Sequence, residues 1–301
     1  KSRGLGGQCS TRRSDQGNFD HGAPHFEAVG EVFQAQVDRW IDQGAVAPWN
    51  ALRATFSEGK LIGSTPNRQR YVGIPGMNEL CKVQAGSIPC LFGTRVTRAG
   101  FENDRWNLTI QDEIATESVD ALVLTVPAAQ AAQLMADHAE YASELSHVRV
   151  HSTWVAVIKL ERFLNTDFEE ILFERGPLSK AIRNRTKPMR DGADTWILYG
   201  DPQWSKDNLE DPPAQASAAL LEQFQRAMGS VGPLYGDVVG HRWRYAQALE
   251  SEHFAPVMSD SRMFLATGSY CFGSSVEGAW TAGQHAARAI KKWYKLRGKR
   301  A

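Results

Sequence analysis

Two glycine-rich segments have the residue types that bind phosphate groups or one end of a cofactor. The first is Arg3-Gly4-Leu5-Gly6-Gly7-Gln8, followed by Thr11-Arg12-Arg13. Glycines let oxyanions approach the backbone closely, and guanidinium groups pair with the same oxygens. The segment therefore predicts a diphosphate-binding loop. The alternative is a flexible basic segment.

The second glycine-rich segment is near the C-terminal end. A short apolar run, Met263 to Thr267, is followed by a turn from Gly268 to Gly273 and then by Val276-Glu277-Gly278 at the start of a long helical pattern. A helix start presents free N–H groups and the positive end of its dipole, which suits the electron-rich end of a reduced cofactor. The alternative, which the segment taken alone favours, is an ordinary serine-capped helix after a glycine turn.

Further segments have residue types suited to binding a substrate. His241-Arg242-Trp243-Arg244-Tyr245 alternates bulky polar and aromatic side chains, as on a strand that lines a cavity, or on an exposed amphipathic strand. Asn184 follows another apolar run and precedes Lys187-Pro188. His21 stands alone beside Asp20, which more often indicates a structural hydrogen bond than catalysis. The sequence contains no serine nucleophile elbow, zinc motif or P-loop.

Composition narrows the class of protein. The 301 residues include 34 Lys and Arg and 34 Asp and Glu, so the net charge is zero, which argues against nucleic acid or an anionic membrane as a partner. The four cysteines are scattered without a Cys-x-x-Cys pair, so we expect a reducing, cytoplasmic location. No apolar run reaches the roughly 18 residues that a membrane-spanning helix needs.

The elements that would position these residues are of two kinds. Short apolar runs at 121–126 and 263–267 precede helical patterns, as in a parallel α/β sheet with both faces covered. The segment 95–110 is typical of a hairpin around Glu102-Asn103-Asp104, and the runs at 150–160 and 195–199 also look antiparallel. Helical spacing predicts helices near 33–41, 213–228 and 275–294, and the second of these should begin at Pro213 and end at Gly229. We therefore expect an α/β fold of mixed α+β type, with a nucleotide-binding layer and a second layer on a mixed, largely antiparallel sheet.

Taken together, the motifs resemble those of bacterial renalase-like FAD-dependent oxidoreductases, which are relatives of the flavin-containing amine oxidases. The resemblance covers essentially the whole chain. It rests on the following segments: residues 1–7 with Thr11-Arg12-Arg13, Asp20-His21-Gly22-Ala23 with Phe26, 73–78, 123–127, 176–179, Arg183-Asn184, Lys187-Pro188, 241–246 and 276–280.

The resemblance implies an enzyme with non-covalently bound FAD. Its substrate would be a small dihydronicotinamide-type molecule that gives a hydride to the flavin, with molecular oxygen as the acceptor and hydrogen peroxide as a product. One alternative is a flavoprotein-derived pseudoenzyme with a structural or binding role and a protein partner. Another alternative is a flavin amine oxidase that acts on amines.

The resemblance also implies roles for individual residues. Asn184, His241, Trp243 and Tyr245 would face the substrate, and no obligatory acid–base residue or metal ligand is expected. Gly22 and Ala23 would lie near the isoalloxazine. The full set of predicted cofactor-binding residues is Arg3, Gly6, Gly7, Thr11, Arg12, Gly22, Ala23, Gly268, Val276, Glu277 and Gly278.

Two domains follow from the same resemblance. Residues 1–35, 76–142 and 240–301 would form a discontinuous, Rossmann-like FAD-binding domain. Residues 36–75 and 143–239 would form the substrate domain. In the family, a first strand–turn–helix–strand unit with a Gly-x-Gly-x-x-Gly turn precedes the position of Lys1, and we expect this unit to be absent from the present chain.

Overall fold

The computed structural model describes residues 4–13, 17–111, 116–229, 231–249 and 254–297. It divides into two compact units, each built from segments that are distant in the sequence. Unit 1 comprises Lys1–Gly4, Pro89–Val150 and Gln247–Ala301, and unit 2 comprises Leu5–Ile88 and His151–Ala246. No described helix is long and apolar enough to cross a membrane.

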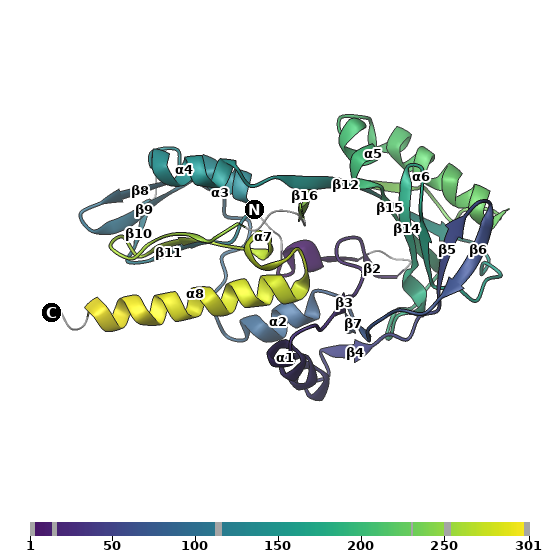
Figure 1. The fold of residues 1–301 in the computed structure, drawn as a ribbon, viewed down its shortest axis with the longest axis horizontal. Coiled ribbons are helices and arrows are strands. Elements are labelled where there is room, and N and C mark those ends of the chain that lie inside the picture. The colour runs from purple at the N-terminus through teal and green to yellow at the C-terminus, as the bar shows by residue number, and fades with distance from the viewer. Residues whose placement is uncertain (1–3, 14–16, 112–115, 230, 250–253, 298–301) are drawn as a thin grey trace. The chain divides into compact units, whose positions relative to one another are not determined.

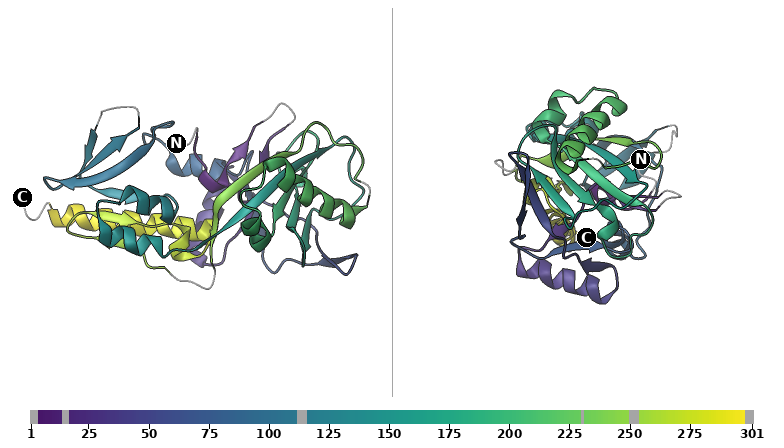
Figure 2. Two further views of the ribbon diagram at one scale, coloured as in Figure 1. Left: turned by 90° about the horizontal axis from the view of Figure 1, so that it is seen from above. Right: turned by 90° about the vertical axis from the view of Figure 1, so that its right-hand side faces the viewer.

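Unit 2 is built on a large mixed sheet with the strand order β16-β12-β15-β14-β13-β5-β6. The strands are β5 (Arg53–Ser57), β6 (Lys60–Ser64), β12 (Val150–Leu160), β13 (Glu170–Phe173), β14 (Leu178–Arg183), β15 (Asp194–Gly200) and β16 (Val239–Ala248). β13 runs parallel to β5, whereas β12–β15, β14–β15, β13–β14 and β5–β6 are antiparallel. The hairpin of β5 and β6 forms one edge (Figure 2). The predicted mixed, largely antiparallel sheet is confirmed.

One face of the large sheet packs against α6 (Pro213–Met228), which lies near α5 (Pro202–Asp207) in Figure 1. Trp154 and Trp196 from the sheet form a buried apolar core with Leu220 and Phe224 from α6. The helix begins with proline, whose fixed φ suits a first helical position, and it ends at Gly229 with a φ of 71°. The predicted helix and both of its ends are confirmed.

Smaller elements of unit 2 carry the segments that the sequence analysis singled out. They are η1 (Gly7–Cys9), β1 (Thr11–Arg12), β2 (Phe19–Asp20), β3 (Phe26–Glu27), α1 (Glu31–Asp42), β4 (Val46–Pro48), β7 (Arg70–Gly73), α2 (Glu79–Ala85) and η2 (Asn184–Thr186). β1 pairs with β2, and β7 lies between β3 and β4. In α1 the buried residues are Phe33, Val37 and Trp40, as their helical spacing predicts.

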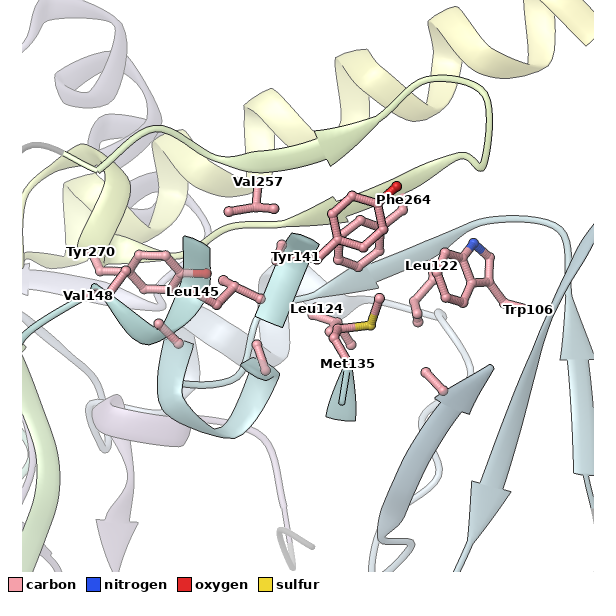
Figure 3. Close-up of a cluster of buried hydrophobic side chains, with 14 of the residues drawn as sticks. Trp106, Leu122, Leu124, Met135, Tyr141, Leu145, Val148, Val257, Phe264 and Tyr270 are labelled. Carbon is pink, nitrogen blue, oxygen red and sulfur yellow. The ribbon is translucent and has the colours of Figure 1, made fainter. Parts of the chain in front are cut away.

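Unit 1 contains a small sheet with helices on both faces. Its strand order is β11 (Leu122–Leu124), β18 (Phe264–Ala266) and β17 (Val257–Ser259), and β11 runs parallel to β18. Leu124 and Phe264 face a core that includes Met135 of the α3 region and Tyr141 of α4 (Figure 3). The helices of the unit are α3 (Ala128–Leu134), α4 (Ala139–Ser146), α7 (Ser269–Phe272) and α8 (Val276–Arg297).

The opposite face of this small sheet packs on α8, since Leu265 joins a second buried cluster with Ala286 and Trp293. Successive residues of a strand point to opposite faces, so the continuous apolar runs at 121–126 and 263–267 bury both faces of the sheet. The predicted parallel pair with helical cover is confirmed.

A β-meander completes unit 1. Its strands are β8 (Val96–Glu102), β9 (Arg105–Ile110) and β10 (Thr116–Val119). Asn103 and Asp104 form the turn between β8 and β9 with φ of 52° and 59°, values that Asn and Asp adopt more readily than most residues. The predicted hairpin over 95–110 is confirmed.

The contacts divide the chain differently from the two predicted domains. Residues 5–35 and 76–88 group with the large sheet rather than with residues 89–142. One cause is the pairing of β3 with β7, and another is a hydrogen bond from Tyr199 of β15 to the backbone of β2. The roles of the two units in cofactor and substrate binding stay predictions.

Candidate functional site

The glycine loop at the start of unit 2 leaves one side of its backbone open. Gly6 and Gly7 have φ of 133° and 53°, so both occupy conformations that favour glycine. The amide of Cys9 donates to the carbonyl of Gly6 at 2.8 Å and closes the turn. A Cβ on Gly6 would lie 2.9 Å from the Cβ of Asn78, whereas a Cβ on Gly7 would meet nothing within 4 Å. The loop therefore packs on one side and is open on the other.

Behind this loop the carboxylate of Asp20 is fully buried and connects several segments of unit 2. Its Oδ1 accepts hydrogen bonds from the Thr11 hydroxyl at 2.6 Å and from the Met77 amide at 3.1 Å. Its Oδ2 accepts from Lys187 Nζ at 3.0 Å and from Arg190 at 2.8 Å. The Thr11 side chain, which we predicted to bind the cofactor, is therefore engaged with Asp20.

Electrostatics keeps this buried group ionised. Burial raises the pKa of Asp20, but the charges of Lys187 and Arg190 and the hydrogen bonds outweigh burial and lower the pKa to about 2. Burial also lowers the pKa of Lys187 to about 8, although the nearby Asp20 opposes this shift. Two cations and one carboxylate thus form a buried cluster that carries a net positive charge.

Asn184 belongs to the same buried cluster. Its side-chain oxygen accepts from the Asp20 amide at 3.2 Å and from Lys187 Nζ at 3.3 Å, and its amide nitrogen donates to the Asn18 carbonyl at 2.9 Å. Only 1% of the residue is exposed. The structure therefore corrects our prediction for Asn184: the side chain is buried among its own chain's polar groups and does not face a substrate.

Tyr199 on β15 links the large sheet to the segment that contains Gly22 and Ala23. Its hydroxyl donates to the carbonyl of Gly22 at 2.9 Å and to that of Asp20 at 3.2 Å. The Ala23 amide donates to the Gln8 carbonyl at 2.7 Å. A Cβ on Gly22 would overlap that same carbonyl oxygen. The close packing of Gly22 on the glycine loop therefore requires a residue without a side chain.

Three rings form an aromatic cluster next to Gly22. The ring centroids of His21 and His241 are 4.8 Å apart, and those of His241 and Trp243 are 4.7 Å apart, with both pairs edge to face. Trp243 donates from Nε1 to the His21 carbonyl at 2.8 Å. The structure therefore brings together two residues that we predicted to face the substrate, His241 and Trp243, and adds His21.

The aromatic cluster is neutral at ordinary pH. Burial, followed by the nearby charges of His241 and Arg12, lowers the pKa of His21 to about 4. Burial and Arg12 also lower the pKa of His241. Arg12 itself is exposed, and no carboxylate of the described residues pairs with it. A neutral aromatic wall thus lies beside a cation with no partner in the described chain.

Tyr245 lies further along β16. Arg242 and Arg244 both pair with Glu210, so they share one face of the strand. Alternation along the strand directs Tyr245 to the other face, the face of His241 and Trp243. The backbone carbonyl of Tyr245 accepts from Gln8 Nε2 at 2.6 Å, which joins β16 to the glycine loop. The role of the Tyr245 ring stays a prediction.

The predicted cofactor residues of unit 1 lie around the start of α8. These are Gly268, Val276, Glu277 and Gly278. The hydroxyl of Ser275 accepts from the Gly278 amide at 3.0 Å and caps the helix. A Cβ on Gly278 would overlap the carbonyl oxygen of Gly273. The helix start is thus serine-capped, as expected for an ordinary helix that follows a glycine turn. It also requires glycine at position 278.

The described residues fit the diphosphate of FAD. The open side of Gly7 leaves room for oxyanions to approach the backbone, and the exposed guanidinium of Arg12 supplies a charge that the described chain does not neutralise. Arg3, which we also predicted to bind the cofactor, is outside the described residues.

The partners of Asp20 are not apparent from the sequence. Lys187 and Arg190 are 167 and 170 residues away from Asp20 in the chain, so no local spacing could reveal the pairing. The sequence itself gives no signal that either cation is buried, because both lie in the segment between β14 and β15, where exposed charges are common.

Three solved structures share this fold. A candidate protoporphyrinogen oxidase from Exiguobacterium sp. 255-15 is 11% identical, with a TM-score of 0.74 over 98% of this chain and 92% of that chain. Cyclohexylamine oxidase from Brevibacterium oxydans IH-35A is 12% identical, with a TM-score of 0.72 over 98% and 92%. A double mutant of putrescine oxidase is 11% identical, with a TM-score of 0.71 over 96% and 92%. At these identities the likeness shows the fold alone.

The family is shown by the sequence itself. A family model described as flavin containing amine oxidoreductase matches residues 14–291, which span the aromatic cluster, the Asp20 cluster and most of α8. The chain therefore belongs to the flavin-containing amine oxidoreductase family and is an FAD-dependent oxidoreductase.

Proposed function

We propose that this enzyme is of the renalase-like type and oxidises a dihydronicotinamide-type substrate, with molecular oxygen as the final acceptor. When bound, FAD supplies the two-electron acceptor for a hydride and passes the electrons on to oxygen. In the overall reaction the substrate loses a hydride and becomes a nicotinamide cation. Oxygen takes up that hydride and one proton from solvent and becomes hydrogen peroxide.

The observation that carries the proposal is the neutral aromatic cluster of His21, His241 and Trp243. Aromatic rings can hold a flat dihydronicotinamide ring and exclude water from it. Because burial lowers the pKa of both histidines, their rings stay uncharged at neutral pH. Hydride loss from a dihydronicotinamide requires no protein acid or base, which agrees with a wall that carries no ionised group.

Amine oxidation is the second candidate, because the neighbours include a cyclohexylamine oxidase and a putrescine oxidase. Flavin absorbance distinguishes the two. Purified full-length protein, loaded with FAD and kept without oxygen, is mixed with isomeric dihydronicotinamide dinucleotides or with cyclohexylamine and putrescine. We expect the dihydronicotinamides to bleach the visible flavin band and the admission of air to restore it with release of peroxide. Bleaching by amines alone would overturn the proposal in favour of an amine oxidase.

A further inference from the structure

The large sheet has a second face, opposite the one that packs on α6. Along each strand, every second side chain points away from the core that packs on α6 and lies on this second face. On it, Lys180 of β14 is paired with Leu172 of β13 on one side and with Tyr199 of β15 on the other. Figure 1 shows β14 and β15 as neighbours in the middle of this sheet. Lys180 is therefore a lysine on a central strand, where an apolar residue is usual.

The carboxylate of Glu170, whose charge acts on Lys180, already has its own partners. Its Oε1 lies 3.1 Å from His25 Nε2, and its Oε2 accepts from Arg53 Nε at 2.8 Å and from Arg70. Glu170 is 1% exposed, so it is buried with two guanidinium groups against one negative charge. Even before Lys180 is considered, these directly paired groups carry more positive than negative charge.

Lys180 adds another cation to this face. Its ammonium lies 5.5 Å from the centre of the Tyr199 ring, and within the described parts of the chain it has no hydrogen bond or ion pair. The residue is half-buried, and burial lowers its pKa while Glu170 opposes that shift. Its charge is also felt at His25, whose pKa it helps to lower.

The ring contact does not compensate for this environment. A cation over an aromatic ring is held more weakly than a cation that is hydrogen-bonded to an anion, and Lys180 is half-buried with only the ring contact. The ammonium of Lys180 would therefore attract an anionic group that came within hydrogen-bond distance of it. The charge of Glu170 acts on Lys180, but within the described residues no carboxylate forms an ion pair with it.

Two residues, Tyr199 and Gly22, connect Lys180 to the aromatic cluster. The Tyr199 ring that it contacts donates its hydroxyl to the Gly22 carbonyl at 2.9 Å. A Cβ on Gly22 would lie 3.5 Å from the Trp243 ring. A series of contacts within unit 2 therefore leads from Lys180 to the aromatic cluster, by way of Tyr199, Gly22 and Trp243.

We propose that the ammonium of Lys180 binds an oxyanion group of the substrate, a phosphate or a carboxylate, while the aromatic cluster holds the ring that is oxidised. This assignment rests on the proposed function for the identity of that ring. It names a specificity-determining residue rather than a catalytic one, because Lys180 would contact the substrate away from the atoms that react.

A pair of substrates that differ only in a phosphate tests this role. The kcat/KM of the FAD-loaded enzyme is measured for isomeric dihydronicotinamide mononucleotide and for the corresponding riboside. We expect the wild type to prefer the mononucleotide by about tenfold or more, and Lys180→Met to reduce that ratio to near one. Lys60→Met, which removes an exposed charge from β6 of the same sheet, serves as the matched control and should keep the ratio.

The carboxylate source is tested in parallel with an amino acid and the amine that lacks its carboxylate. If Lys180→Met removes a preference for the amino acid instead, the oxyanion role holds with a carboxylate as its source. If the variant lowers both members of each pair by the same factor, Lys180 has only a structural role and the assignment is overturned. Retention of an undiminished preference in Lys180→Met would overturn it as well.

A binding measurement separates this inference from the proposed function. Nicotinamide mononucleotide and nicotinamide riboside are titrated into the FAD-loaded protein, and affinity is measured by calorimetry without turnover. If the wild type binds the mononucleotide more tightly than the riboside and Lys180→Met does not, the oxyanion site is supported. This result holds even if the enzyme oxidises no dihydronicotinamide. The oxyanion site would be overturned if the wild type bound both ligands equally and also showed no preference for the amino acid over the amine that lacks its carboxylate.

Discussion

At the scale of single residues, Trp243 is the clearest candidate for a substrate contact. Its indole is fixed by the hydrogen bond to the His21 carbonyl and by the edge-to-face contact with His241. We expect Trp243→Ala to lower kcat/KM by roughly tenfold or more, about 1.4 kcal/mol, because the ring that orients the substrate is lost. The content of bound FAD, measured by absorbance after gel filtration, should fall much less.

Two further variants control this prediction. Trp243→Phe keeps an aromatic ring but removes the Nε1 donor, so its loss of kcat/KM should be smaller than that of Trp243→Ala. Tyr235→Ala, at a residue that is 49% exposed, should leave both quantities unchanged. Equal losses of FAD and of turnover in Trp243→Ala would mean that the tryptophan serves only as a core residue.

Asp20 has a different role, which concerns stability. Its folded-state pKa of about 2 is below its ordinary value of 3.8, so its ionised form stabilises the fold above pH 4. That contribution is lost as the pH falls from about 4 towards 2. We expect Asp20→Asn to lower the free energy of unfolding by about 3 kcal/mol at pH 7, because Lys187 and Arg190 would keep their buried charges without a partner.

Urea unfolding at pH 7, 4 and 3 measures this effect. The difference between wild type and Asp20→Asn should shrink as the pH falls below 4, because the wild type then loses the same charge. Asp137→Asn is the control, since Asp137 is 41% exposed in its pair with Arg98 and such surface pairs contribute about 1 kcal/mol or less. A variant as stable as the wild type at pH 7 would show that the Asp20 cluster does not stabilise unit 2.

At the scale of elements, α8 offers two glycines with opposite expected effects. A Cβ on Gly278 would overlap the Gly273 carbonyl, whereas a Cβ on Gly283 would meet nothing within 4 Å. We expect Gly278→Ala to destabilise the protein by about 1–3 kcal/mol through overpacking. Gly283→Ala, five residues further along the helix, should be stabilising by about 0.5–1 kcal/mol, because alanine loses less conformational freedom on folding.

Thermal unfolding of both variants measures the difference. If Gly278→Ala and Gly283→Ala shifted the melting temperature in the same direction, the close contact between the Gly273 carbonyl and Gly278 would be refuted. The sequence places Gly278 at the helix start and Gly283 within the helix, but it does not show which of them tolerates a side chain. Only the turn that folds back onto the helix start separates them.

Elements whose signals are local were predictable. The spacing of Phe33, Val37 and Trp40 indicated α1, and Pro213 and Gly229 marked the ends of α6. Asn103 and Asp104 marked the β8–β9 turn. Each of these signals depends on residues within one or two turns of each other, so tertiary contacts did not have to be known.

At the scale of the whole molecule, binding of FAD should be visible as stability. A ligand at 100 times its Kd stabilises the folded state by about 2.7 kcal/mol, which corresponds to roughly 5 °C in melting temperature for a chain of this size. We expect that rise when FAD is added to protein stripped of flavin. Riboflavin, which lacks the diphosphate, should give a smaller rise.

Arg12→Ala tests the same prediction at the glycine loop. Because its guanidinium is exposed and has no carboxylate partner among the described residues, the variant should reduce the shift given by FAD but not the one given by riboflavin. Equal shifts with FAD and riboflavin in the wild type would contradict a diphosphate role for this loop.

The sequence by itself determined the class of the protein, the mixed sheet and the family, because hydrophobic periodicity and the order of motifs are properties of the chain alone. It also singled out His241 and Trp243, whose alternation on one strand is local. The tertiary structure alone decided that Asn184 is internal, that Asp20 pairs with Lys187 and Arg190, and that Lys180 lies over the Tyr199 ring without a carboxylate partner among the described residues. The physical reason is that charge pairing depends on which distant segments fold against each other, which residue spacing does not encode.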